Sequence, residues 1–423
     1  MSNTVRWTAG VVAAGLAAAV AGCGTARPTG PQPPTAVRGV VFREPAVSPR
    51  PYGAADTAFG MDVLGAWCRA DPHANIVLSP SSLATSLGMA YLGARGATAK
   101  VMAGVLRLPA ASGQRLEAGL QARSAALRGL DGPRVTVAAS DQVWADPSLV
   151  TSHSYLNAVA TGYDAGVRHV PVLSRPALAA QEIDNAIAAA TRGHIAHLLD
   201  AQSLGSTGWV LTDAMYLHAA WAQPFAASAT SPAPFTSAAG TRVSARYMHG
   251  GQFPVTQADG WTAVSLPYQG DQLAMLALLP APGAGACPTV SPVAMKAVTA
   301  GLATPGRSHS SLIALPRVSL SSKLKMNQLL ISLGMGNAFG PSANFSGLSP
   351  QACCIGTVEH AATLKVGEKG TVASAATATG MEPTAAAPPQ ARIWFNRPYL
   401  LMVVDQATGE PLFLARVANP AAS

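Results

Sequence analysis

The chain contains few combinations of residues that could carry out catalysis. Ser322 and Lys325 have the Ser-x-x-Lys spacing with which some hydrolases pair a nucleophile and its base. The Lys-Thr-Gly sequence that completes that site is missing, so the spacing is better explained by coincidence. A Gly-x-Ser-x-Gly turn, a P-loop and a Rossmann glycine set are missing as well. A secreted serine hydrolase is therefore a remote alternative, and the chain is not expected to be an enzyme.

The spacing of His and Cys residues does not resemble a metal site, because zinc sites use patterns such as Cys-x-x-Cys or His-x-x-x-His. We therefore expect no metal and no other cofactor. The net charge of +8 arises from 28 Lys and Arg against only 20 Asp and Glu. The basic residues are scattered and form no stripe that could follow a phosphate backbone, so nucleic-acid binding is not expected.

The composition is sufficient for one large domain. Of 423 residues, 49% are hydrophobic and only 11% are charged, which permits a sizeable core. Helical periodicity occurs mainly early, at residues 57–68, 81–92, 176–191 and 325–333. β-rich runs lie mostly later, at residues 134–144, 208–217, 264–279 and 393–404. This segregation predicts an α+β fold rather than alternating βαβ units.

Short motifs occur along the chain in a distinctive order. The first group reads Asn75-Ile76-Val77-Leu78-Ser79-Pro80-Ser81-Ser82-Leu83 and Leu87-Gly88-Met89-Ala90-Tyr91-Leu92-Gly93. The middle group reads Thr191-Arg192-Gly193-His194-Ile195, Leu211-Thr212-Asp213-Ala214-Met215-Tyr216-Leu217, Trp221, Pro224-Phe225, Leu266-Pro267-Tyr268 and Leu279-Pro280. The last group reads Leu333-Gly334-Met335, Asn344-Phe345-Ser346-Gly347, Phe395-Asn396-Arg397-Pro398-Tyr399 and Pro411-Leu412-Phe413-Leu414-Ala415-Arg416. Together these motifs resemble those of the serpin family of serine protease inhibitors.

The resemblance implies an α+β fold with three β-sheets, about eight or nine helices and an exposed reactive-centre loop. It places the domain at residues 55–420 and the loop at about 368–392. The implied activity is that of a monomeric inhibitor of a serine protease that acts as a suicide substrate. The protease cuts the loop and forms an acyl-enzyme, and the freed hinge inserts into the central sheet before hydrolysis. A non-inhibitory carrier or scaffold with the same fold is the alternative.

The hinge at the start of this loop has a composition suited to insertion. It reads Glu368-Lys369-Gly370-Thr371-Val372-Ala373-Ser374-Ala375-Ala376-Thr377 and carries no charge after Lys369. In an extended segment Thr371, Ala373 and every second residue after them would point to one face, and each is small enough to enter a packed sheet. Val372 would point to the other face. Composition alone also fits an Ala/Thr-rich surface linker.

The reactive bond within the loop is expected at one of several neighbouring positions. Counting from the hinge by the family spacing puts it at Thr384–Ala385, whereas counting back from the last motif group points nearer Ala387. The further candidates are Ala386 and Met381. Thr and Ala side chains fit a shallow primary pocket, so the expected target is an elastase-like or subtilisin-like serine protease. Met381 would suit a deeper apolar pocket.

The resemblance assigns a structural role to residues that could otherwise suggest a catalytic triad. Ser79, Ser82 and His360 match the family's shutter, a hydrogen-bonded group under the middle of the central sheet, and Asp213 stands in the place of its Asn. Trp221 matches the breach at the end of that sheet. A triad is disfavoured because Ser79 precedes a proline and opens a helix instead of lying on a strained turn. A carboxylate beside His360 suggests that sheet opening depends on pH.

The N-terminus has the layout of a secretory signal. Arg6 precedes an apolar run from Trp7 to Val20, and small residues then lead to Cys23. This arrangement resembles a bacterial lipobox. It predicts a lipoprotein signal at residues 1–22, acylation of Cys23 and a Pro/Gly-rich tether at residues 23–54. The protein is then expected on the extracellular face of the cell membrane, with ordinary cleavage and secretion as the alternative.

Export would allow the remaining cysteines, Cys68, Cys287, Cys353 and Cys354, to form disulfides. Their connectivity does not follow from their number. Adjacent Cys353 and Cys354 would close only a strained ring, so a bond from one of them to Cys287 or Cys68 is as much expected as no bond.

Overall fold

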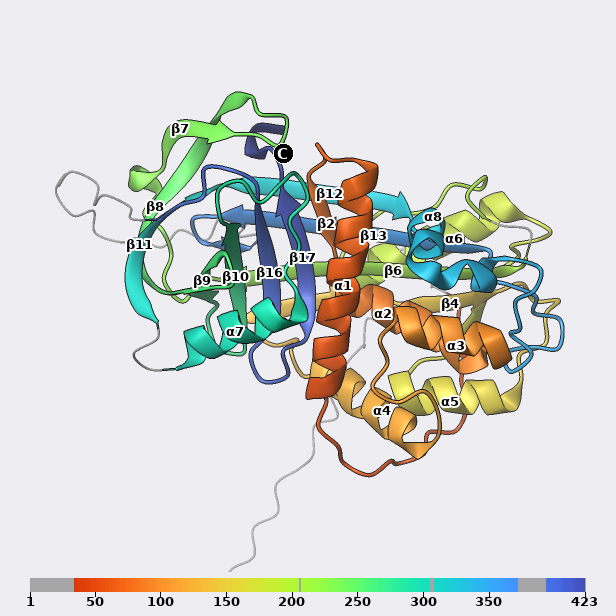
Figure 1. Ribbon diagram of the computed structural model, residues 1–423. Coiled ribbons are helices and arrows are strands. Elements are labelled where there is room, and N and C mark those ends of the chain that lie inside the picture. Colours follow the sequence, from red (N-terminus) through yellow and green to blue (C-terminus); the bar gives the residue numbers. More distant parts are fainter. Residues whose placement is uncertain (1–33, 205–206, 305–307, 372–392, 423) are drawn as a thin grey trace, which may run out of the picture. The chain divides into compact units, whose positions relative to one another are not determined.

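The computed structural model describes residues 34–204, 207–304, 308–371 and 393–422. The chain divides into Met1–Gln32 and Pro33–Ser423, and every element below belongs to the second unit. The described residues of this unit contain eight α-helices (Figure 1): α1 (Arg50–Ala70), α2 (Pro80–Gly93), α3 (Gly96–Val105), α4 (Gln114–Arg128), α5 (His153–Tyr163), α6 (Pro176–Ala190), α7 (Pro292–Ala303) and α8 (Asn327–Leu330).

Local sequence explains where several helices begin. Pro80 opens α2, where proline is favourable, and the Ser79 hydroxyl accepts a hydrogen bond from the backbone N–H of Ser82 (3.1 Å). Ser152 and Ser291 cap α5 and α7 in the same way. The predicted helical segments fall in α1, α2, α6 and α8, whereas α3, α4, α5 and α7 were not predicted from periodicity.

The strands of the described residues form two hydrogen-bonded sheets. The eight-stranded central sheet consists of β1 (Ala36–Val37), β3 (Val135–Ala139), β4 (Gln142–Ala145), β5 (Val167–His169), β6 (Trp209–Ala220), β12 (Val318–Lys325), β13 (Thr357–Gly367) and β14 (Gly370–Thr371). The nine-stranded second sheet consists of β2 (Ile76–Leu78), β7 (Ser231–Thr236), β8 (Arg242–Ala258), β9 (Trp261–Pro267), β10 (Leu273–Pro280), β11 (His309–Pro316), β15 (Ile393–Trp394), β16 (Tyr399–Asp405) and β17 (Pro411–Val417).

The prediction of three sheets differs from this topology because β8 joins two groups of strands. Its first part pairs with β7 and its middle with β11, while its last residues pair with β9. Gly250 and Gly251 lie within the middle part, with φ of 133° and 74°, a backbone region that favours glycine. The register of β8 with β11 shifts at the same place. A long, bent strand therefore makes one continuous sheet out of the expected second and third sheets.

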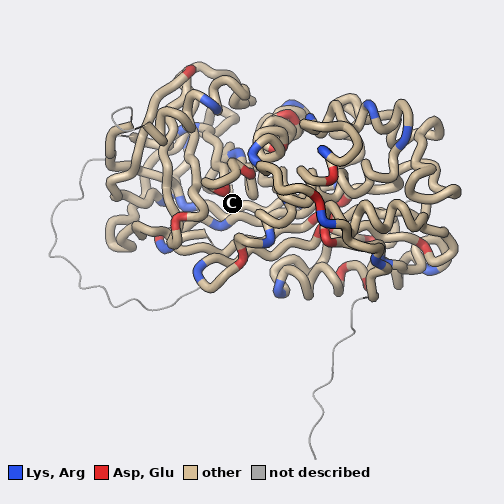
Figure 2. The backbone as a smooth tube through the Cα atoms, turned by 90° about the horizontal axis from the view of Figure 1, so that it is seen from below, with Lys and Arg blue, Asp and Glu red and all other residues tan. Residues whose placement is uncertain are grey.

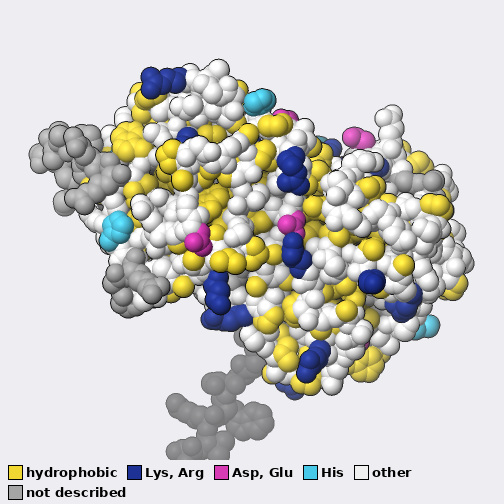
Figure 3. All heavy atoms as spheres, viewed as in Figure 1, with side chains coloured by type: hydrophobic (Ala, Val, Ile, Leu, Met, Phe, Trp, Pro, Cys, Tyr) yellow, Lys and Arg dark blue, Asp and Glu magenta, His cyan; other side chains and the backbone are white. Residues whose placement is uncertain are grey.

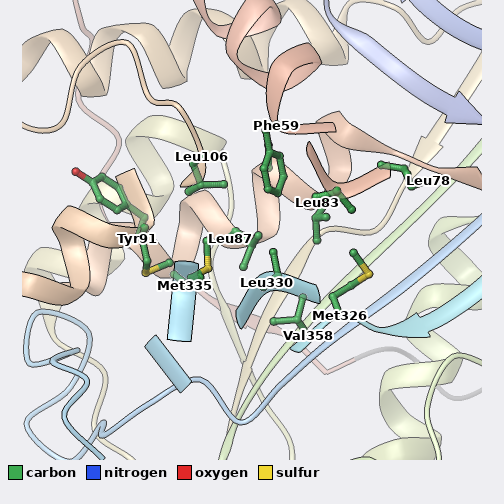
Figure 4. Close-up of a cluster of buried hydrophobic side chains, with 14 of the residues drawn as sticks. Phe59, Leu78, Leu83, Leu87, Tyr91, Leu106, Met326, Leu330, Met335 and Val358 are labelled. Carbon is green, nitrogen blue, oxygen red and sulfur yellow. The ribbon is translucent and has the colours of Figure 1, made fainter. Parts of the chain in front are cut away.

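The main core lies between the two sheets around α2, which contacts both β6 and β17. Figure 4 shows Phe59 of α1, Leu83 and Leu87 of α2, Leu330 of α8 and Val358 of β13 gathered in one cluster, and all of them are buried. Burial of each such side chain contributes about 1.5–3 kcal/mol. The core therefore fixes the inner face of the central sheet against α2.

The opposite face of the central sheet is covered by α6. Ile183 and Ile187 of α6 pack with Val210 and Ala214 of β6. Because neighbouring residues of a strand point to opposite faces, Asp213 of β6 belongs to the inner face, on the side of α2. This alternation decides which side chains lie under the sheet.

The disulfides correct one expectation. Cys68, at the end of α1, bonds to Cys287 in the loop after β10, with Cα atoms 5.7 Å apart, and Cys353 bonds to its neighbour Cys354. The fold brings Cys68 and Cys287 together across 219 residues, which leaves the adjacent pair only each other. A bond that closes such a long loop contributes roughly 2–5 kcal/mol of stability.

Among the described residues, no helix has both the length and the apolar character needed to cross a membrane.

Candidate functional site

The start of the predicted hinge lies inside the central sheet. Gly370–Thr371 form β14, where Thr371 stands opposite Val366 of β13 on one side and Ala219 of β6 on the other. Thr371 is 0% exposed, and its hydroxyl lies 2.5 Å from that of Tyr268. The two hinge residues that form β14 thus occupy a strand position between β6 and β13.

Gly370 is the residue at which the chain enters the sheet. It has a φ of 150°, and a Cβ atom at this position would lie 2.1 Å from the carbonyl oxygen of Ala219. Any other residue type would therefore collide with the backbone of β6. The glycine permits the close approach of the hinge to its neighbour strand.

Trp221, the predicted breach residue, closes the end of the central sheet over the hinge. Its indole N–H donates to the carbonyl oxygen of Gly367 (2.8 Å), and its ring stacks on that of Tyr268 with centroids 4.5 Å apart. Its backbone N–H donates to the carbonyl oxygen of Lys369 (2.9 Å). Burial raises the pKa of Tyr268 above its ordinary value, more than the Thr371 hydrogen bond lowers it. Tyr268 therefore keeps the proton that it can share with Thr371.

Glu368 fixes the turn between β13 and β14. Its backbone carbonyl accepts a hydrogen bond from the N–H of Phe225 (2.8 Å), and its carboxylate accepts one from the hydroxyl of Thr230 (2.8 Å). The carboxylate also lies 3.6 Å from Nε of Arg317 in an ion pair. The entry point of the hinge is thus held by residues that follow β6 and by the link between β11 and β12.

The two central strands are parted next to β14. Residues 210–215 of β6 pair directly with residues 357–362 of β13, and β14 fills the level of Ala219 and Val366. Between these levels, residues 216–218 and 363–365 have no backbone pairing with each other among the described residues, although β3 and β12 pair with their outer edges. We call this stretch the open seam. Its backbone groups can accept a further strand.

The segment after α6 lies over the outer face of the open seam. The ring of His194 stacks on that of Tyr216 with centroids 3.6 Å apart and planes 6° apart, and Arg192 donates to the hydroxyl of Thr136 on β3 (3.1 Å). Partial burial and the nearby charges of Lys365, His218 and Arg192 lower the pKa of His194. In the sequence this segment is visible only as a short motif, because its contacts join residues far apart in the chain.

The inner face of the direct β6–β13 pairing carries a buried polar pair. Asp213 and His360 stand opposite each other in the register, both are 0% exposed, and Nδ1 of His360 is hydrogen-bonded to Oδ1 of Asp213. Within the described residues, Oδ2 of Asp213 and Nε2 of His360 are buried without a partner. Burial raises the pKa of Asp213 above its ordinary value, and His360 lowers it. The structure therefore places two of the four predicted shutter residues in contact across the two strands.

The two predicted shutter serines make their hydrogen bonds elsewhere. Ser82 donates to Oδ1 of Asp141, in the turn between β3 and β4, and the Ser79 hydroxyl lies 3.3 Å from both Oγ of Ser81 and Sδ of Met215. Asp141 was missed from the sequence because its position 59 residues after Ser82 carries no local pattern. Within the described residues no serine is hydrogen-bonded to His360 Nε2, so this group does not form a nucleophile and base.

Asp141 gives the first prediction. Burial raises its pKa well above the ordinary value of 3.8, the Ser82 hydrogen bond lowers it, and the charge of Asp213 raises it further. The folded state thus binds this proton more tightly than the unfolded chain, so stability falls as the pH rises from about 3.8 through the folded pKa. Asp141→Asn keeps an acceptor for the Ser82 hydroxyl but removes the carboxyl group that titrates. We expect it to stabilise the fold by at least about 1 kcal/mol above that pKa and to flatten the pH dependence.

Urea unfolding between pH 4 and 8 measures this effect. Asp200→Asn serves as the control, because the side chain of Asp200 is 81% exposed. A parallel pH dependence of the unmodified protein and Asp141→Asn would contradict the prediction.

Other predicted site residues lie outside the described residues. They are Cys23, the hinge residues Val372, Ala373, Ser374, Ala375, Ala376 and Thr377, and the reactive-bond candidates Met381, Thr384, Ala385, Ala386 and Ala387. In the described part of the chain, no three His, Cys, Asp or Glu side chains lie together as a metal site. The Lys and Arg positions are scattered along the described backbone (Figure 2).

Comparison with known proteins agrees with this geometry. The family model for serpins, described as serine protease inhibitors, matches residues 54–420. An uncharacterized serpin-like protein of Thermococcus kodakarensis is 31% identical over 353 residues, which cover 82% of this chain and 81% of that protein. The leukocyte elastase inhibitor of Bos taurus is 27% identical over 377 residues, which cover 87% of this chain and 99% of that protein.

Solved structures share the fold at lower sequence identity. The thermophilic serpin tengpin in its native state has a TM-score of 0.74 at 22% identity and covers 90% of this chain and 97% of its own. Uncleaved ovalbumin has a TM-score of 0.72 at 22% identity and covers 87% of this chain and 100% of its own. The family model describes serine protease inhibitors and not enzymes, and this gives the class of the chain. The chain belongs to the serpin family, which confirms the family and the α+β fold predicted from the sequence.

Proposed function

We propose that the protein inhibits a serine protease as a suicide substrate, through cleavage of its loop at or near Thr384–Ala385 and insertion of the hinge between β6 and β13. One observation carries this proposal: β14 already stands between these strands, and the open seam lies directly ahead of it. A surface linker would not need a glycine-specific entry or a buried seat for Thr371. The family match supports the same activity.

The register of β14 predicts the level between β6 and β13 that each further hinge residue would occupy on insertion. If the antiparallel pairing continued, Val372 would lie between His218 and Lys365, and the next two residues would lie at the remaining levels of the open seam. Ala375 is the first residue whose insertion must break a direct pair, that of Met215 with Ala362. The first three steps therefore gain backbone hydrogen bonds without losing any.

Deeper insertion reaches the buried polar pair. The same register brings Thr377 to the level of Asp213 and His360, on the inner face that Thr371 also occupies. Asp213 and His360 must then separate, and the Thr377 hydroxyl can bond to the atoms that they expose. A hydroxyl at this position reduces the cost of parting two buried polar groups, which is about 1–3 kcal/mol for each group left unpaired.

The target follows from the loop sequence. Thr384, Ala385, Ala386 and Ala387 are small, so we propose an elastase-like or subtilisin-like protease with a shallow primary pocket. The Bos taurus relative is named an elastase inhibitor, which supports this choice. We propose that the inhibitor acts as a monomer.

The decisive experiment is incubation of the protein with elastase and with subtilisin, followed by SDS gel electrophoresis. We expect an SDS-resistant complex of the protease with the inhibitor, because the acyl bond is trapped by insertion. A protease whose active serine has been blocked is the control and forms no such complex. The panel also includes trypsin-like and chymotrypsin-like enzymes. If these proteases cut the loop but none of them forms a complex, the non-inhibitory carrier or scaffold is favoured.

We further propose that the mature protein is a lipoprotein acylated at Cys23 and displayed outside the cell membrane. The apolar run before Cys23 and the small residues next to it support this location. Cys23→Ser should move the protein from the detergent phase to the aqueous phase in a phase-partitioning experiment, because the lipid chains supply the anchoring affinity. A variant that partitions like the unmodified protein would contradict the lipid anchor.

A further inference from the structure

The segment before α1 runs along α4 and α5 and is hydrogen-bonded to both helices. Figure 1 shows it as the red-orange chain that runs beneath these two helices. We call residues 36–47 the strap. The strap begins with β1, which pairs with β5 at the edge of the central sheet. Further along, the backbone N–H of Val40 donates to Asn157 (2.8 Å) and that of Phe42 to Thr161 (3.0 Å), both of α5.

Helix α4 holds the second half of the strap through one side chain. Nε2 of Gln121 donates to the carbonyl oxygen of Phe42 (2.8 Å), and Oε1 of Gln121 accepts from the N–H of Glu44 (3.0 Å). The backbone of the strap is therefore tied to polar side chains by four hydrogen bonds at three residues. The polar groups of α4 and α5 thus bind the backbone of the strap, and most of the strap's side chains are exposed.

Many of the exposed side chains of the strap are apolar. In the described part of the chain, five of the ten large hydrophobic residues that are exposed lie in the strap, with exposed fractions of 45% for Val37, 61% for Val40, 56% for Val41, 53% for Phe42 and 43% for Val47. Exposed apolar residues scattered singly need no explanation, but half of them in eleven consecutive positions mark an interaction surface. Figure 3 shows hydrophobic and basic side chains side by side at the lower edge of this face.

The charges of the strap indicate the partner. Arg38 and Arg43 are exposed within it, while its one acid, Glu44, is half-buried. Arg38 also pairs with Asp164 (3.0 Å), whose charge it neutralises. Arg43 is therefore the exposed arginine of the strap that is not engaged with Asp164. Apolar side chains beside such an arginine suit an anionic lipid surface, where the apolar groups enter the interface and the guanidinium group contacts phosphate.

The chain outside the described residues favours the same partner. Ala36 follows Cys23 by thirteen residues, so a lipid at Cys23 could lie no farther from the strap than about 45 Å of extended chain. At such a distance even weak contacts act at high effective concentration. We propose that the strap is a docking surface for an anionic bilayer, in which Val40, Val41 and Phe42 enter the interface. Docking would set the orientation of the body on the membrane.

The test uses the chain that begins at Gly24. This chain lacks only the predicted signal and the acylated residue, and it retains every described element. Its four cysteines are bonded in pairs, so a cysteine introduced elsewhere is the single thiol available to an environment-sensitive dye. Val41→Cys places the dye in the strap. Val293→Cys is the matched control, because Val293 is 74% exposed on α7, outside the strap.

We expect the dye of Val41→Cys to shift to the blue on phosphatidylglycerol vesicles, and not on phosphatidylcholine vesicles, while that of Val293→Cys stays unchanged on both. Vesicle flotation should show that Val40→Ser/Val41→Ser/Phe42→Ser raises the lipid concentration for half-maximal binding at least about tenfold, since three apolar side chains are lost. Thermal melting confirms that this exposed triple variant is folded.

Three results would overturn the proposal. The first is an equal dye shift at the two positions, and the second is vesicle binding of the triple variant that equals that of the unmodified chain. The third is that neither form binds vesicles, while the unmodified chain self-associates and the triple variant does not. The last result would identify the strap as an interface between copies. None of these depends on inhibition or on acylation, so each can be distinguished from failure of the proposed function.

Discussion

Cleavage of the loop between residues 381 and 387 should raise the melting temperature by about 10 °C or more, because roughly ten newly paired residues each add on the order of 1 kcal/mol. In an ordinary domain, a nick adds entropy to the opened states and leaves stability equal or lower. Here the cut would free the hinge to fill the open seam and then to continue between β6 and β13. Differential scanning calorimetry of intact and cleaved protein measures the shift.

The matched control is a cut in a surface loop that has no seam ahead of it. The loop at residues 283–285, between β10 and α7, is exposed and suits an engineered protease site. Cleavage there should leave the melting temperature level or lower it. If cleavage at residues 381–387 behaves in the same way, the loop is an inert linker or the protein is a non-inhibitory scaffold.

Thr371→Arg should convert the inhibitor into a substrate. Thr371 has no exposed surface and its hydroxyl meets that of Tyr268, so a guanidinium in this position would be buried without a carboxylate partner among those contacts. An unpaired buried ion costs several kcal/mol even after relaxation. Because Thr371 already lies in β14 of the intact protein, we expect the longer side chain to leave this position there, and insertion must then bring it back at that cost. Insertion slows, and the acyl-enzyme hydrolyses first. A barrier that is higher by about 1.4 kcal/mol slows insertion about tenfold, so the ratio of hydrolysed to trapped acyl-enzyme should rise about tenfold. We therefore expect more inhibitor molecules to be consumed per protease.

Titration of protease activity against each variant gives this stoichiometry. Thr371→Ser, which keeps the hydroxyl and removes only a methyl group, should inhibit like the unmodified protein. A stoichiometry of Thr371→Arg equal to that of Thr371→Ser would contradict insertion through β14. Thermal melting of both variants separates a slower insertion from a general loss of stability.

The sequence predicted the family and the fold because serpin motifs such as those around Ser79 and Phe395 are local and occur in order. Features that depend on distant contacts were not predictable. Asp141 meets Ser82 only because the turn between β3 and β4 passes α2, and Cys68 meets Cys287 only because the end of α1 reaches the loop after β10. The continuity of the second sheet depends on where β8 bends, which becomes clear only when its partners β7, β9 and β11 are in place.

The hinge shows the same division. Its small residues and their alternation were readable, as was the glycine at position 370. The seat of Thr371 against Tyr268 required the three-dimensional structure, because Tyr268 lies 103 residues before it in the chain. The separation of the predicted shutter into one pair across the strands and a second group on α2 likewise follows from packing and not from residue type.

The direct pairing of β6 with β13 is parallel, whereas β14 is antiparallel to both. Parallel ladders have slanted hydrogen bonds and are slightly less stable per residue. Each residue inserted beyond the open seam therefore exchanges one level of the weaker ladder for two levels of the stronger one. This exchange favours the inserted state, because return would require two ladders to open so that one can re-form. The parallel direction of β6 and β13 thus favours insertion over withdrawal at each level beyond the open seam.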